Sequence, residues 1–597
     1  MPAEKAKNFG GAMRRLAGYL RPQWPAVAAV FVMTILSVGS NIAGPRIMET
    51  GINELVSAVS QKISAGAAAR MDFTPFGRAL TLMLGAYLAA ALFLFVQSRL
   101  MTRVSRNVIY HMRREVDRKL SRLPLSYYDG TGRGEILSRV TNDIDNISAT
   151  LQQNLTQIVT AVFTLFGVLI MMFTIHATLT LLCLLTLPLM FLATALIMRR
   201  SQKYFGTQWA STGALGALTE EAYTGHEIIT AFGREEAMRT RFGEENTRLY
   251  RAGFRAQFLS GIIMPMMWML NNLNFVVVCV YGGVQVAGGA MSFGAVQAMI
   301  QYARQFTQPI QQTSAILNML QSTAASAERV FELLDVAEET PDTGDTRLSD
   351  PRGAVCFENV SFAYRPDAPL IAHMNLSLRP GQRVAIVGPT GAGKTTIVNL
   401  LMRFYELDEG RITVDGTDIR SMRRRDLRAL FGMVLQDTWL FHGTIRENIA
   451  YGRQDADAAA VRRAASVASV DHFVRTLEHG YDTEINDDAT NISQGQKQLL
   501  TIARAFLSDP QILILDEATS SVDTRTEILI QRAMEKLMQN RTSFIIAHRL
   551  STIRDADLIL VMRDGAIVEQ GRHEELLAQG GFYAEMYNSQ FAEEATS

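Results

Sequence analysis

Glycines, a lysine and a threonine stand at a diagnostic spacing within this 597-residue chain. The segment Gly388–Thr395 is GPTGAGKT, which matches the pattern GxxxxGK[ST]. It follows the apolar run RVAIV and precedes a segment with the apolar periodicity of a helix. Glycines let backbone N–H groups curl around phosphate oxygens, and the N-terminus of the next helix adds positive potential. The pattern predicts a phosphate-binding loop in which Lys394 contacts the outer phosphates and Thr395 offers its hydroxyl to Mg²⁺.

Two adjacent carboxylates follow another apolar run further along the chain. Asp516 ends the run ILILD, and Glu517 comes next. An acidic residue at such a strand end can hold Mg²⁺ through water, and its neighbour can polarise an attacking water. Either side chain could instead be a solvated strand end. Because a phosphate loop lies in the same region, the pair predicts nucleotide hydrolysis.

The first half of the chain contains four windows without Asp, Glu, Lys or Arg. They are residues 25–45, 79–98, 151–198 and 256–303. A bilayer core about 30 Å thick needs roughly 20 apolar residues of helix, so each short window predicts one membrane span and each long window two. The alternative is buried core helices of a soluble protein, which rarely stay free of charge for roughly 20 residues. The sequence therefore predicts six spans.

The charged residues and cysteines indicate the partners, orientation and location of the chain. Lys plus Arg (58) balance Asp plus Glu (58), so the bulk charge indicates no nucleic-acid partner. Basic residues beside the spans, among them Arg14, Arg15 and Arg21, predict that the N-terminus lies in the cytoplasm. The expected location of the chain is the inner (plasma) membrane. No cleavable signal peptide is expected at residues 1–21. The three scattered cysteines argue against a disulfide framework or a metal site.

The pattern changes in the second half of the chain. Residues 337–351 are polar and rich in turn-forming residues, and beyond them short β-rich runs alternate with helical patterns. We therefore expect a multi-domain chain, with an all-α six-helix transmembrane domain at residues 1–325 and a linker at residues 326–352. An α/β P-loop nucleotide-binding domain follows at residues 353–597.

This order of features resembles that of ABC transporters of the exporter type, in which a membrane domain is fused ahead of an ATPase domain. The resemblance covers nearly the whole chain, which is most similar in organisation to bacterial multidrug-like half-transporters. It implies an ATP hydrolase coupled to export of amphipathic or drug-like compounds or lipids by alternating access, with ATP and Mg²⁺ as cofactors. It also implies that residues 126–147 and 218–236 are coupling segments, which press short helices onto ATPase domains.

The resemblance assigns roles to individual residues. Tyr364 matches the aromatic residue that stacks on adenine, and Gln436 matches the glutamine that senses Mg²⁺. Glu517 matches the catalytic base, His548 the histidine that contacts the γ-phosphate, and Asp523 the loop that crosses the dimer interface. The implied ATP-binding residues are Tyr364, Gly388, Pro389, Thr390, Gly391, Ala392, Gly393, Lys394, Thr395, Thr396 and Gln436. The implied metal ligands are Thr395, Gln436 and Asp516.

The stretch NISQGQKQLL at residues 491–500 departs from the family pattern. Family members usually carry LSGGQ, a signature that acts in trans on ATP held by the opposite subunit. Ser493, Gly495 and Gln496 match, but Gln494 adds a side chain and is expected to restrict the backbone. We expect a heterodimer, whose second half-transporter supplies a regular signature and lacks a working glutamate equivalent to Glu517. The alternative is a homodimer in which Gln494 is tolerated.

Polar residues recur on one face of the sixth predicted span. They are Gln297, Gln301, Gln305, Gln308 and Gln312, with Arg304 close by. The face could line a pathway for a small-molecule cargo or make hydrogen bonds between helices. No Asp or Glu lies inside the spans, so no proton relay is evident and ATP is the expected energy source. An importer of siderophore-like cargo and an ATP-gated regulator or channel subunit remain as alternatives.

Overall fold

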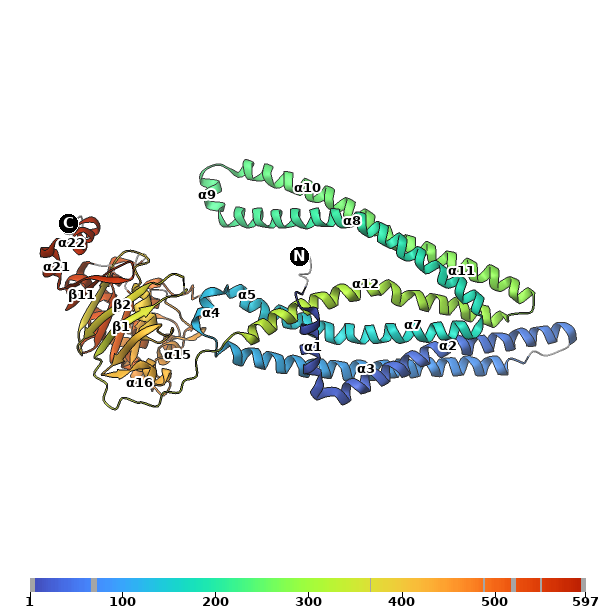
Figure 1. Cartoon of the computed structure of the whole chain (residues 1–597), viewed down its shortest axis with the longest axis horizontal. Coiled ribbons are helices and arrows are strands. Elements are labelled where there is room, and N and C mark those ends of the chain that lie inside the picture. Colours follow the sequence, from blue (N-terminus) through green and yellow to red (C-terminus); the bar gives the residue numbers. More distant parts are fainter. Residues whose placement is uncertain are drawn as a thin grey trace. The chain divides into compact units, whose positions relative to one another are not determined.

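The computed structural model describes residues 6–65, 72–365, 367–436, 438–486, 489–516, 522–547 and 550–591. The chain forms two compact units. One comprises Met1–Arg122 and Thr131–Val336, and the other comprises Leu123–Gly130 and Ala337–Ser597. The first unit is helical and the second contains the β-sheets (Figure 1).

The helical unit is built from long helices joined by short turns. They are α1 (Phe9–Leu20), η1 (Arg21–Gln23), α2 (Trp24–Ala65), α3 (Thr74–Leu120), α5 (Arg133–Ser138), η2 (Arg139–Asp143), α6 (Ile144–Ala149), η3 (Thr150–Asn154), α7 (Leu155–Ile175), α8 (Ala177–Thr224), α9 (His226–Ala231), α10 (Glu235–Gly261), α11 (Ile263–Ala287) and α12 (Phe293–Asp335). Helices α2 and α3 pack along each other, and α8 and α10 form a hairpin with α9 at its tip (Figure 1).

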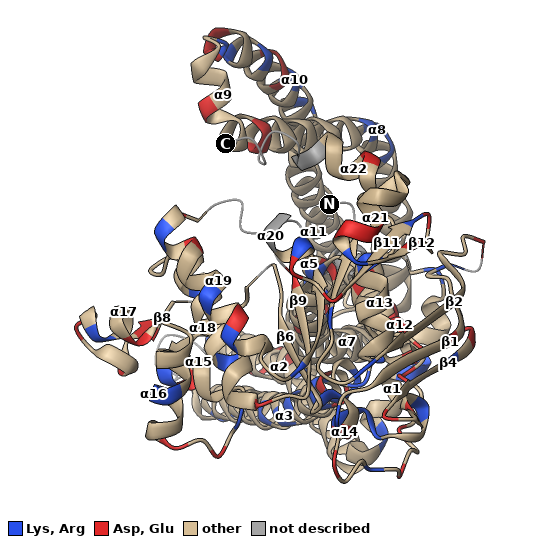
Figure 2. Cartoon of the chain, turned by 90° about the vertical axis from the view of Figure 1, so that its left-hand side faces the viewer, with Lys and Arg blue, Asp and Glu red and all other residues tan. Residues whose placement is uncertain are grey.

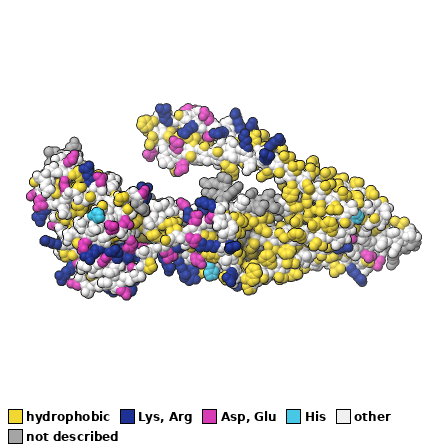
Figure 3. Space-filling model, viewed as in Figure 1, with side chains coloured by type: hydrophobic (Ala, Val, Ile, Leu, Met, Phe, Trp, Pro, Cys, Tyr) yellow, Lys and Arg dark blue, Asp and Glu magenta, His cyan; other side chains and the backbone are white. Residues whose placement is uncertain are grey.

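Five helical segments among the described residues are long and apolar enough to cross a membrane. They are Phe9–Ser64, Thr74–Leu120, Arg133–Ile175, Ala177–Thr224 and Glu235–Ala287. Many of their apolar side chains are exposed, including Leu185 and Trp268 at 72% each. Hydrophobic side chains cover much of this unit in Figure 3. An apolar surface of this extent is what lipid-facing helices present.

The sixth predicted span falls on α12, which is not among these five segments. With 43 residues, α12 is longer than the roughly 20 that a bilayer requires. Its row of glutamines, together with Arg304, makes it less apolar than the other spans. By length and composition, the structure therefore supports five of the six predicted spans.

Helix α12 is anchored in the core of the helical unit. Tyr302 is fully buried, and its hydroxyl donates to the backbone oxygen of Ile42 on α2 at 2.7 Å. It belongs to a cluster with Met172 of α7, Leu179 of α8 and Val278 of α11. Because helices distant in sequence meet here, α12 is held at the centre of the bundle.

Two π-helical turns, η2 and η3, interrupt the helical stretch between α5 and α7. Both pack against α12. At η2 the buried carboxylate of Asp143 accepts hydrogen bonds from Arg329 Nε at 2.9 Å and Nη2 at 2.5 Å. At η3 the hydroxyl groups of Thr150 and Thr323 lie 2.5 Å apart. Turns of this kind carry a residue more than an α-helical turn, and here they bring polar side chains onto α12.

The second unit is organised around two β-sheets. The strands are β1 (Val355–Phe362), β2 (Ile371–Leu378), β3 (Arg383–Val387), β4 (Glu409–Val414), β5 (Thr417–Asp418), β6 (Phe431–Val434), β7 (Gly443–Thr444), β8 (Glu484–Ile485), β9 (Ile512–Asp516), β10 (Thr542–Ile546), β11 (Leu558–Arg563) and β12 (Ala566–Gly571). One sheet has the order β2-β1-β4-β5 and is antiparallel. The six-stranded sheet has the order β12-β11-β3-β10-β9-β6 and is parallel except for β12. Strands β7 and β8 form a separate small pair.

The parallel strands are continuous apolar runs because both faces of their sheet are covered. Along β9, Ile512 and Ile514 enter one core cluster, whereas Leu513 and Leu515 enter the other. The expectation of a largely parallel α/β sheet is confirmed. Acidic and basic residues are interspersed around this unit rather than segregated (Figure 2).

Helices connect and cover these strands. They are α13 (Lys394–Leu401), η4 (Ile419–Ser421), α14 (Arg424–Arg428), α15 (Ile445–Ala450), α16 (Ala458–Val467), α17 (Asp471–Thr476), η5 (Gly480–Asp482), α18 (Gln494–Ser508), α19 (Thr524–Met538), α20 (Leu550–Arg554), α21 (His573–Gln579) and α22 (Phe582–Phe591). A further short helix, α4 (Leu125–Gly130), packs in this unit although its sequence lies between α3 and α5.

The register of the parallel strands brings their carboxyl ends together. Ile546 at the end of β10 aligns with Ile386 of β3 on one side and Asp516 of β9 on the other. Val434 at the end of β6 aligns with Leu515 of β9. The segments that follow β3, β6, β9 and β10 therefore begin at one edge of the sheet, the edge at which α/β sheets bind ligands.

Candidate functional site

The loop that joins β3 to α13 depends on its glycines. The φ angles are +151° at Gly388, +85° at Gly391 and +94° at Gly393, a region that residues with a Cβ rarely adopt. A Cβ at Gly388 would lie only 2.2 Å from the backbone oxygen of Met562. Gly393 also precedes the first residue of α13, Lys394. The glycine spacing thus reflects backbone conformation and a close approach to β11.

The ammonium group of Lys394 is held against this loop. Its Nζ donates to the backbone oxygen of Gly388 at 2.7 Å and to that of Pro389 at 3.0 Å. Burial lowers the pKa of Lys394 below its usual value, and the charge of Asp516 opposes that shift. An oriented cation beside a helix N-terminus is suited to phosphate oxygens.

A cavity of about 440 Å³ lies at this edge of the sheet. It is lined by Tyr364, Leu370, Thr390, Gly391, Ala392, Gly393, Lys394, Thr395, Thr396, Gln436, Asp516 and Ile546. The structure thus brings together every residue expected to bind ATP except Gly388 and Pro389, which belong to the same loop. Sequence reasoning missed Leu370 and Ile546. The second could have been found as the last residue of a strand at this edge, whereas Leu370 carries no comparable signal.

The three expected metal ligands line the same cavity. Thr395 offers a hydroxyl, Gln436 an amide and Asp516 a carboxylate. Hard oxygen donors of this kind fit Mg²⁺, which keeps several waters and is usually bound through few protein side chains plus substrate phosphates. No group of three or more His, Cys, Asp or Glu suited to a metal occurs elsewhere in the described part of the chain.

Tyr364 is fixed at its hydroxyl end and exposed over much of its ring. The hydroxyl donates to Thr396 Oγ1 at 3.2 Å and accepts from Asn399 Nδ2 at 3.1 Å. The residue remains 45% exposed. A part-exposed aromatic ring at the cavity can stack on a planar base.

The remaining implied catalytic residues are only partly described. Glu517 and His548 lie outside the described residues. Asp523 is the N-cap of α19, where its Oδ1 accepts from the backbone N–H of Thr526 at 3.0 Å. This hydrogen bond lowers the pKa of Asp523 below its usual value.

The signature begins a helix rather than forming a free loop. Ser493 is the N-cap of α18, where its hydroxyl accepts from Gln496 N and its own N–H donates to Gln496 Oε1. Gln494 is the first residue of α18 and is not among the described residues with positive φ. The side chain of Gln494 therefore causes no backbone strain here, because the right-handed helical conformation is open to residues with a Cβ. Its amide Nε2 lies 3.5 Å from Thr438 Oγ1.

Glycine is required one position later. A Cβ on Gly495 would lie 2.4 Å from Thr526 Cγ2 and 2.9 Å from Val522 Cγ1. The start of α18 therefore touches the segment around Asp523 and the first turn of α19. Two motifs that the sequence presented separately form one contact.

The glutamine row of α12 turns away from the buried face of that helix. Arg304 and Gln308 are exposed, and Gln297, Gln301, Gln305 and Gln312 are half-buried. Gln312 Oε1 accepts from Gln157 Nε2 of α7 at 3.0 Å. The Arg304 guanidinium lies 5.7 Å from the ring centre of Phe275 on α11. Hydrogen bonding between helices thus accounts for Gln312, while Arg304 presents a charge beside an aromatic ring.

Each predicted coupling segment contains a short helix. Residues 126–147 include all of α4 except its first residue, and residues 218–236 include α9. Large side chains at the α9 turn are strongly exposed: Tyr223 by 86%, Ile228 by 66% and Phe232 by 77%. An exposed apolar cluster at the tip of a charged hairpin is typical of a surface that another protein covers.

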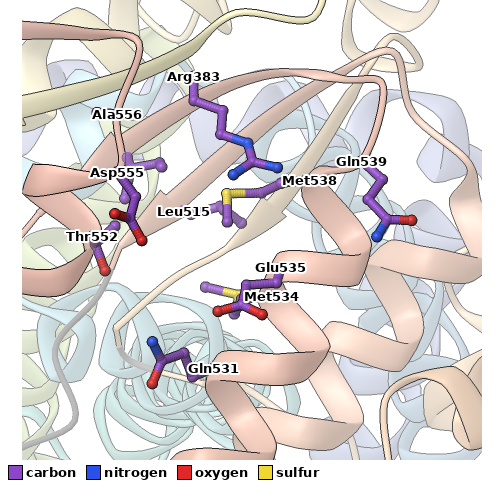
Figure 4. Close-up of a pocket in the computed structure, with 11 residues that line it drawn as sticks. Arg383, Leu515, Gln531, Met534, Glu535, Met538, Gln539, Thr552, Asp555 and Ala556 are labelled. Carbon is purple, nitrogen blue, oxygen red and sulfur yellow. The ribbon is translucent and has the colours of Figure 1, made fainter.

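A second cavity, of about 250 Å³, lies between α19, α20 and the six-stranded sheet (Figure 4). Leu515, Met534 and Met538 supply apolar walls, and Arg383 and Asp555 supply charged groups. None of the residues singled out from the sequence lines it.

Comparisons with known proteins agree with this architecture. The family model for the ABC transporter transmembrane region matches residues 27–310, and the ABC transporter model matches residues 371–520. A fatty acid ABC transporter ATP-binding/permease protein of Mycobacterium bovis is 49% identical over 98% of this chain and 97% of its own length. An ATP-dependent lipid A-core flippase of Syntrophus aciditrophicus is 35% identical over 84% of this chain and 83% of its own.

A solved structure has the same fold over nearly the whole chain. A bacterial Atm1-family ABC exporter with ATP bound aligns with a TM-score of 0.71 and 29% identity, covering 96% of this chain and 98% of that one. Apolar helices precede a sheet unit with an assembled phosphate loop, and relatives match the chain almost from end to end. This multi-pass membrane protein therefore belongs to the ABC transporter family, as a half-transporter of the exporter type with an ATP-binding domain.

Proposed function

We propose that this chain is one half of an ATP-driven exporter of amphipathic anions such as fatty acids. The observation that carries the proposal is the cavity at the carboxyl edge of the six-stranded sheet, which gathers Lys394, Thr395, Gln436 and Asp516. The fusion of this nucleotide site to apolar helices couples ATP to movement across a membrane.

ATP binds along the cavity, with its base on Tyr364 and its phosphates on the β3–α13 loop. The amides of the loop and the ammonium group of Lys394 would contact the phosphates. Thr395, Gln436 and Asp516 would hold Mg²⁺, and the bound ion would neutralise negative charge on the phosphates.

Hydrolysis requires a base beside the γ-phosphate. Glu517 directly follows Asp516 and orients the attacking water, and His548, two residues after β10 ends at Ile546, contacts the γ-phosphate. Both assignments rest on the family pattern and the strand ends that precede these residues.

The cargo is assigned from charge. No acidic residue occurs in the predicted spans, whereas α12 exposes Arg304 beside a row of glutamine amides. A guanidinium with amide donors recognises a carboxylate or phosphate head group, and apolar helices accommodate an acyl chain. The relatives from M. bovis and S. aciditrophicus are named for fatty acid and lipid A-core cargo, which supports an amphipathic anion.

A second half-transporter completes the molecule. The exposed cluster of Tyr223, Ile228 and Phe232 at the α9 turn is suited to docking on the ATPase unit of that subunit. The signature at residues 493–496 then faces the partner's ATP. We keep the heterodimer as the proposed assembly, because Gln494 places a side chain where the trans phosphate is expected.

The chain lies in the inner membrane with the sheet unit in the cytoplasm, where ATP is available. Basic residues near the first span, Arg14, Arg15 and Arg21, support this orientation. We propose that the nucleotide-binding domain begins at residue 353 and that the linker before it begins after α12 ends at Asp335, rather than at residue 326.

The test is transport into inside-out vesicles of the cell membrane that naturally contains this chain, so that the proposed partner subunit is present. ATP-dependent accumulation of a labelled fatty acid is compared with that of the neutral alcohol of equal length. Lys394→Ala and Glu517→Gln are expected to abolish accumulation, with ATPase activity lowered at least about 100-fold. Arg304→Gln should reduce accumulation of the acid roughly tenfold and spare the alcohol, whereas Arg304→Lys, which keeps the charge, should retain most activity.

Each other outcome excludes part of the proposal. Accumulation only in right-side-out vesicles would make the protein an importer. ATP hydrolysis without accumulation against a gradient would favour a regulator or channel subunit. If Arg304→Gln reduced accumulation of the acid and the alcohol equally, the assignment of an anionic cargo would be excluded, whereas ATP-driven transport would still be supported.

A further inference from the structure

An aromatic cluster adjoins the nucleotide cavity. The rings of Tyr364 and Tyr405 meet edge-to-face at 4.9 Å between centroids and an interplanar angle of 89°. Phe362 contacts both, at 4.9 Å to Tyr364 and 5.6 Å to Tyr405. Because the hydroxyl of Tyr364 is bonded to two residues of α13, its ring is fixed between the phosphate-loop helix and Tyr405. A nucleotide base that stacks on Tyr364 would therefore contact the same ring that Tyr405 contacts.

Tyr405 contacts α4 at its other end. Its hydroxyl donates to Asp129 Oδ2 at 2.5 Å. Burial and this bond raise the pKa of Tyr405 above its usual value, so the phenol keeps the proton that it donates. Helix α4 is joined by short segments to α3, which ends at Leu120, and to α5, which begins at Arg133.

The side chain of Tyr405 thus contacts both the aromatic residue at the nucleotide cavity and α4. One edge of its ring meets the aromatic residue at the nucleotide cavity, and its hydroxyl holds the short helix within the first predicted coupling segment. Edge-to-face pairs have a preferred geometry, and a rigid phenol transmits a tilt of its ring to its hydroxyl. Coupling between the two sites requires that such an element have two states and that both sites shift the balance between them.

We propose that Tyr405 is a positioning residue that transmits occupancy of the base site at Tyr364 to α4. The inference rests on the proposed ATP site. A base on Tyr364 restricts that ring, the restricted ring holds Tyr405 in the position that reaches Asp129, and α4 stays docked. Since coupling free energies are reciprocal, docking of α4 strengthens nucleotide binding by the same factor.

The test uses the full chain in lipid nanodiscs and compares two matched variants. Tyr405→Phe removes the hydroxyl and keeps the ring. Tyr481→Phe removes an equivalent bond elsewhere in the same unit, because Tyr481 donates to Asp471 Oδ1 at the same 2.5 Å. Hydrogen exchange of the amides at residues 123–130 is measured with and without ATP, and the Kd of a fluorescent ATP analogue is measured in parallel.

ATP is expected to slow exchange of α4 in the wild type and in Tyr481→Phe. In Tyr405→Phe the protection by ATP should fall roughly three- to tenfold, the effect of losing one charge-assisted bond at a part-exposed site. Asp129→Ala removes the same bond from its other end and should give the same loss. Combining it with Tyr405→Phe should add nothing further.

The outcomes separate this inference from the proposed function. Unchanged protection of α4 in Tyr405→Phe, with ATP still bound, would overturn the coupling and leave the ATP site intact. A much larger rise in Kd, beyond about tenfold, would make Tyr405 part of the base site itself and also overturn it. Absence of ATP binding in the wild type would instead remove the proposed function.

Discussion

Gly495 lies where two segments of the nucleotide-binding unit approach too closely for a side chain. It occupies the first turn of α18, and its nearest neighbours are the Thr526 methyl group and Val522. Helical propensity alone favours alanine over glycine by about 1 kcal/mol. A contact of 2.4 Å outweighs this gain, because overpacking typically costs about 1–3 kcal/mol.

Gly495→Ala is therefore expected to lower the thermal stability of the nucleotide-binding unit and to impair ATPase activity. Thr526→Ser removes the methyl group that a new Cβ would meet, so the double variant should recover part of both losses. Unfolding temperature and ATPase rate are measured for the two single variants and the pair. Equal losses in the single Gly495→Ala variant and the double variant would show that the clash is not the cause.

At this scale, the sequence predicted the residues whose role depends on backbone conformation. Gly388, Gly391 and Gly393 follow from a spacing that encodes positive φ. The glycine pattern does not reveal that Gln494 starts a helix, where the backbone does not need a glycine. The contact between Gly495 and Thr526 joins residues far apart in sequence, and no local pattern indicates it.

The imidazole of His573 links the C-terminal helices α21 and α22. His573 Nδ1 lies 2.7 Å from the hydroxyl of Tyr583, and its ring contacts those of Tyr583 and Tyr587. Burial, with a contribution from Arg554, lowers the pKa of His573 below its usual 6.5. Burial also raises the pKa of Tyr583 to about 12, so the phenol stays neutral.

Docking of these helices should weaken on mild acidification. With a lowered pKa in the folded state, the unfolded chain takes up the proton first. Stability is therefore complete above pH 6.5 and is lost as the pH falls below that value towards the lower folded pKa. Hydrogen exchange of residues 573–591, corrected for intrinsic rates, measures this between pH 7.5 and about 5.

The control is His573→Phe, which keeps a ring but cannot take up a proton. Its exchange should be independent of pH in this range, whereas Tyr583→Phe should retain the dependence. An equal dependence in wild type and His573→Phe would assign the effect to another group.

Elements were predictable where hydrophobic periodicity was strong. The parallel strands and five spans follow from apolar runs. Helix α12 was harder to predict as a span because its glutamines make it less apolar, and one of them, Gln312, bonds to Gln157. The packing of α4 in the sheet unit depends on contacts such as that of Asp129 with Tyr405, which periodicity does not contain.

The assembly determines what Gln494 does in the whole transporter. Its right-handed backbone means that any defect comes from the side chain and not from conformation. If the proposed asymmetric pair is correct, this chain purified alone has low ATPase activity without cooperativity. Both Gln494→Gly and Gln494→Ala should then raise that activity several-fold, and to a similar extent.

Steady-state ATPase measurements on the isolated chain, with its mass in detergent, test this prediction. Robust and cooperative activity from a pure wild-type homodimer would exclude the heterodimer. If ATPase activity rose in Gln494→Gly but not in Gln494→Ala, the low activity would be due to the backbone conformation at this position and not to the side chain.

The π-helical turns η2 and η3 have a consequence for the long segment that contains them. Each inserts about one residue, and one residue advances a helix by about 100°. The side of the segment that faces α12 therefore changes phase twice between residues 139 and 154. A substitution scan along residues 133–175 should show a 3.6-residue rhythm that is broken at both turns, so that a heptad assignment made on one side of them fails on the other.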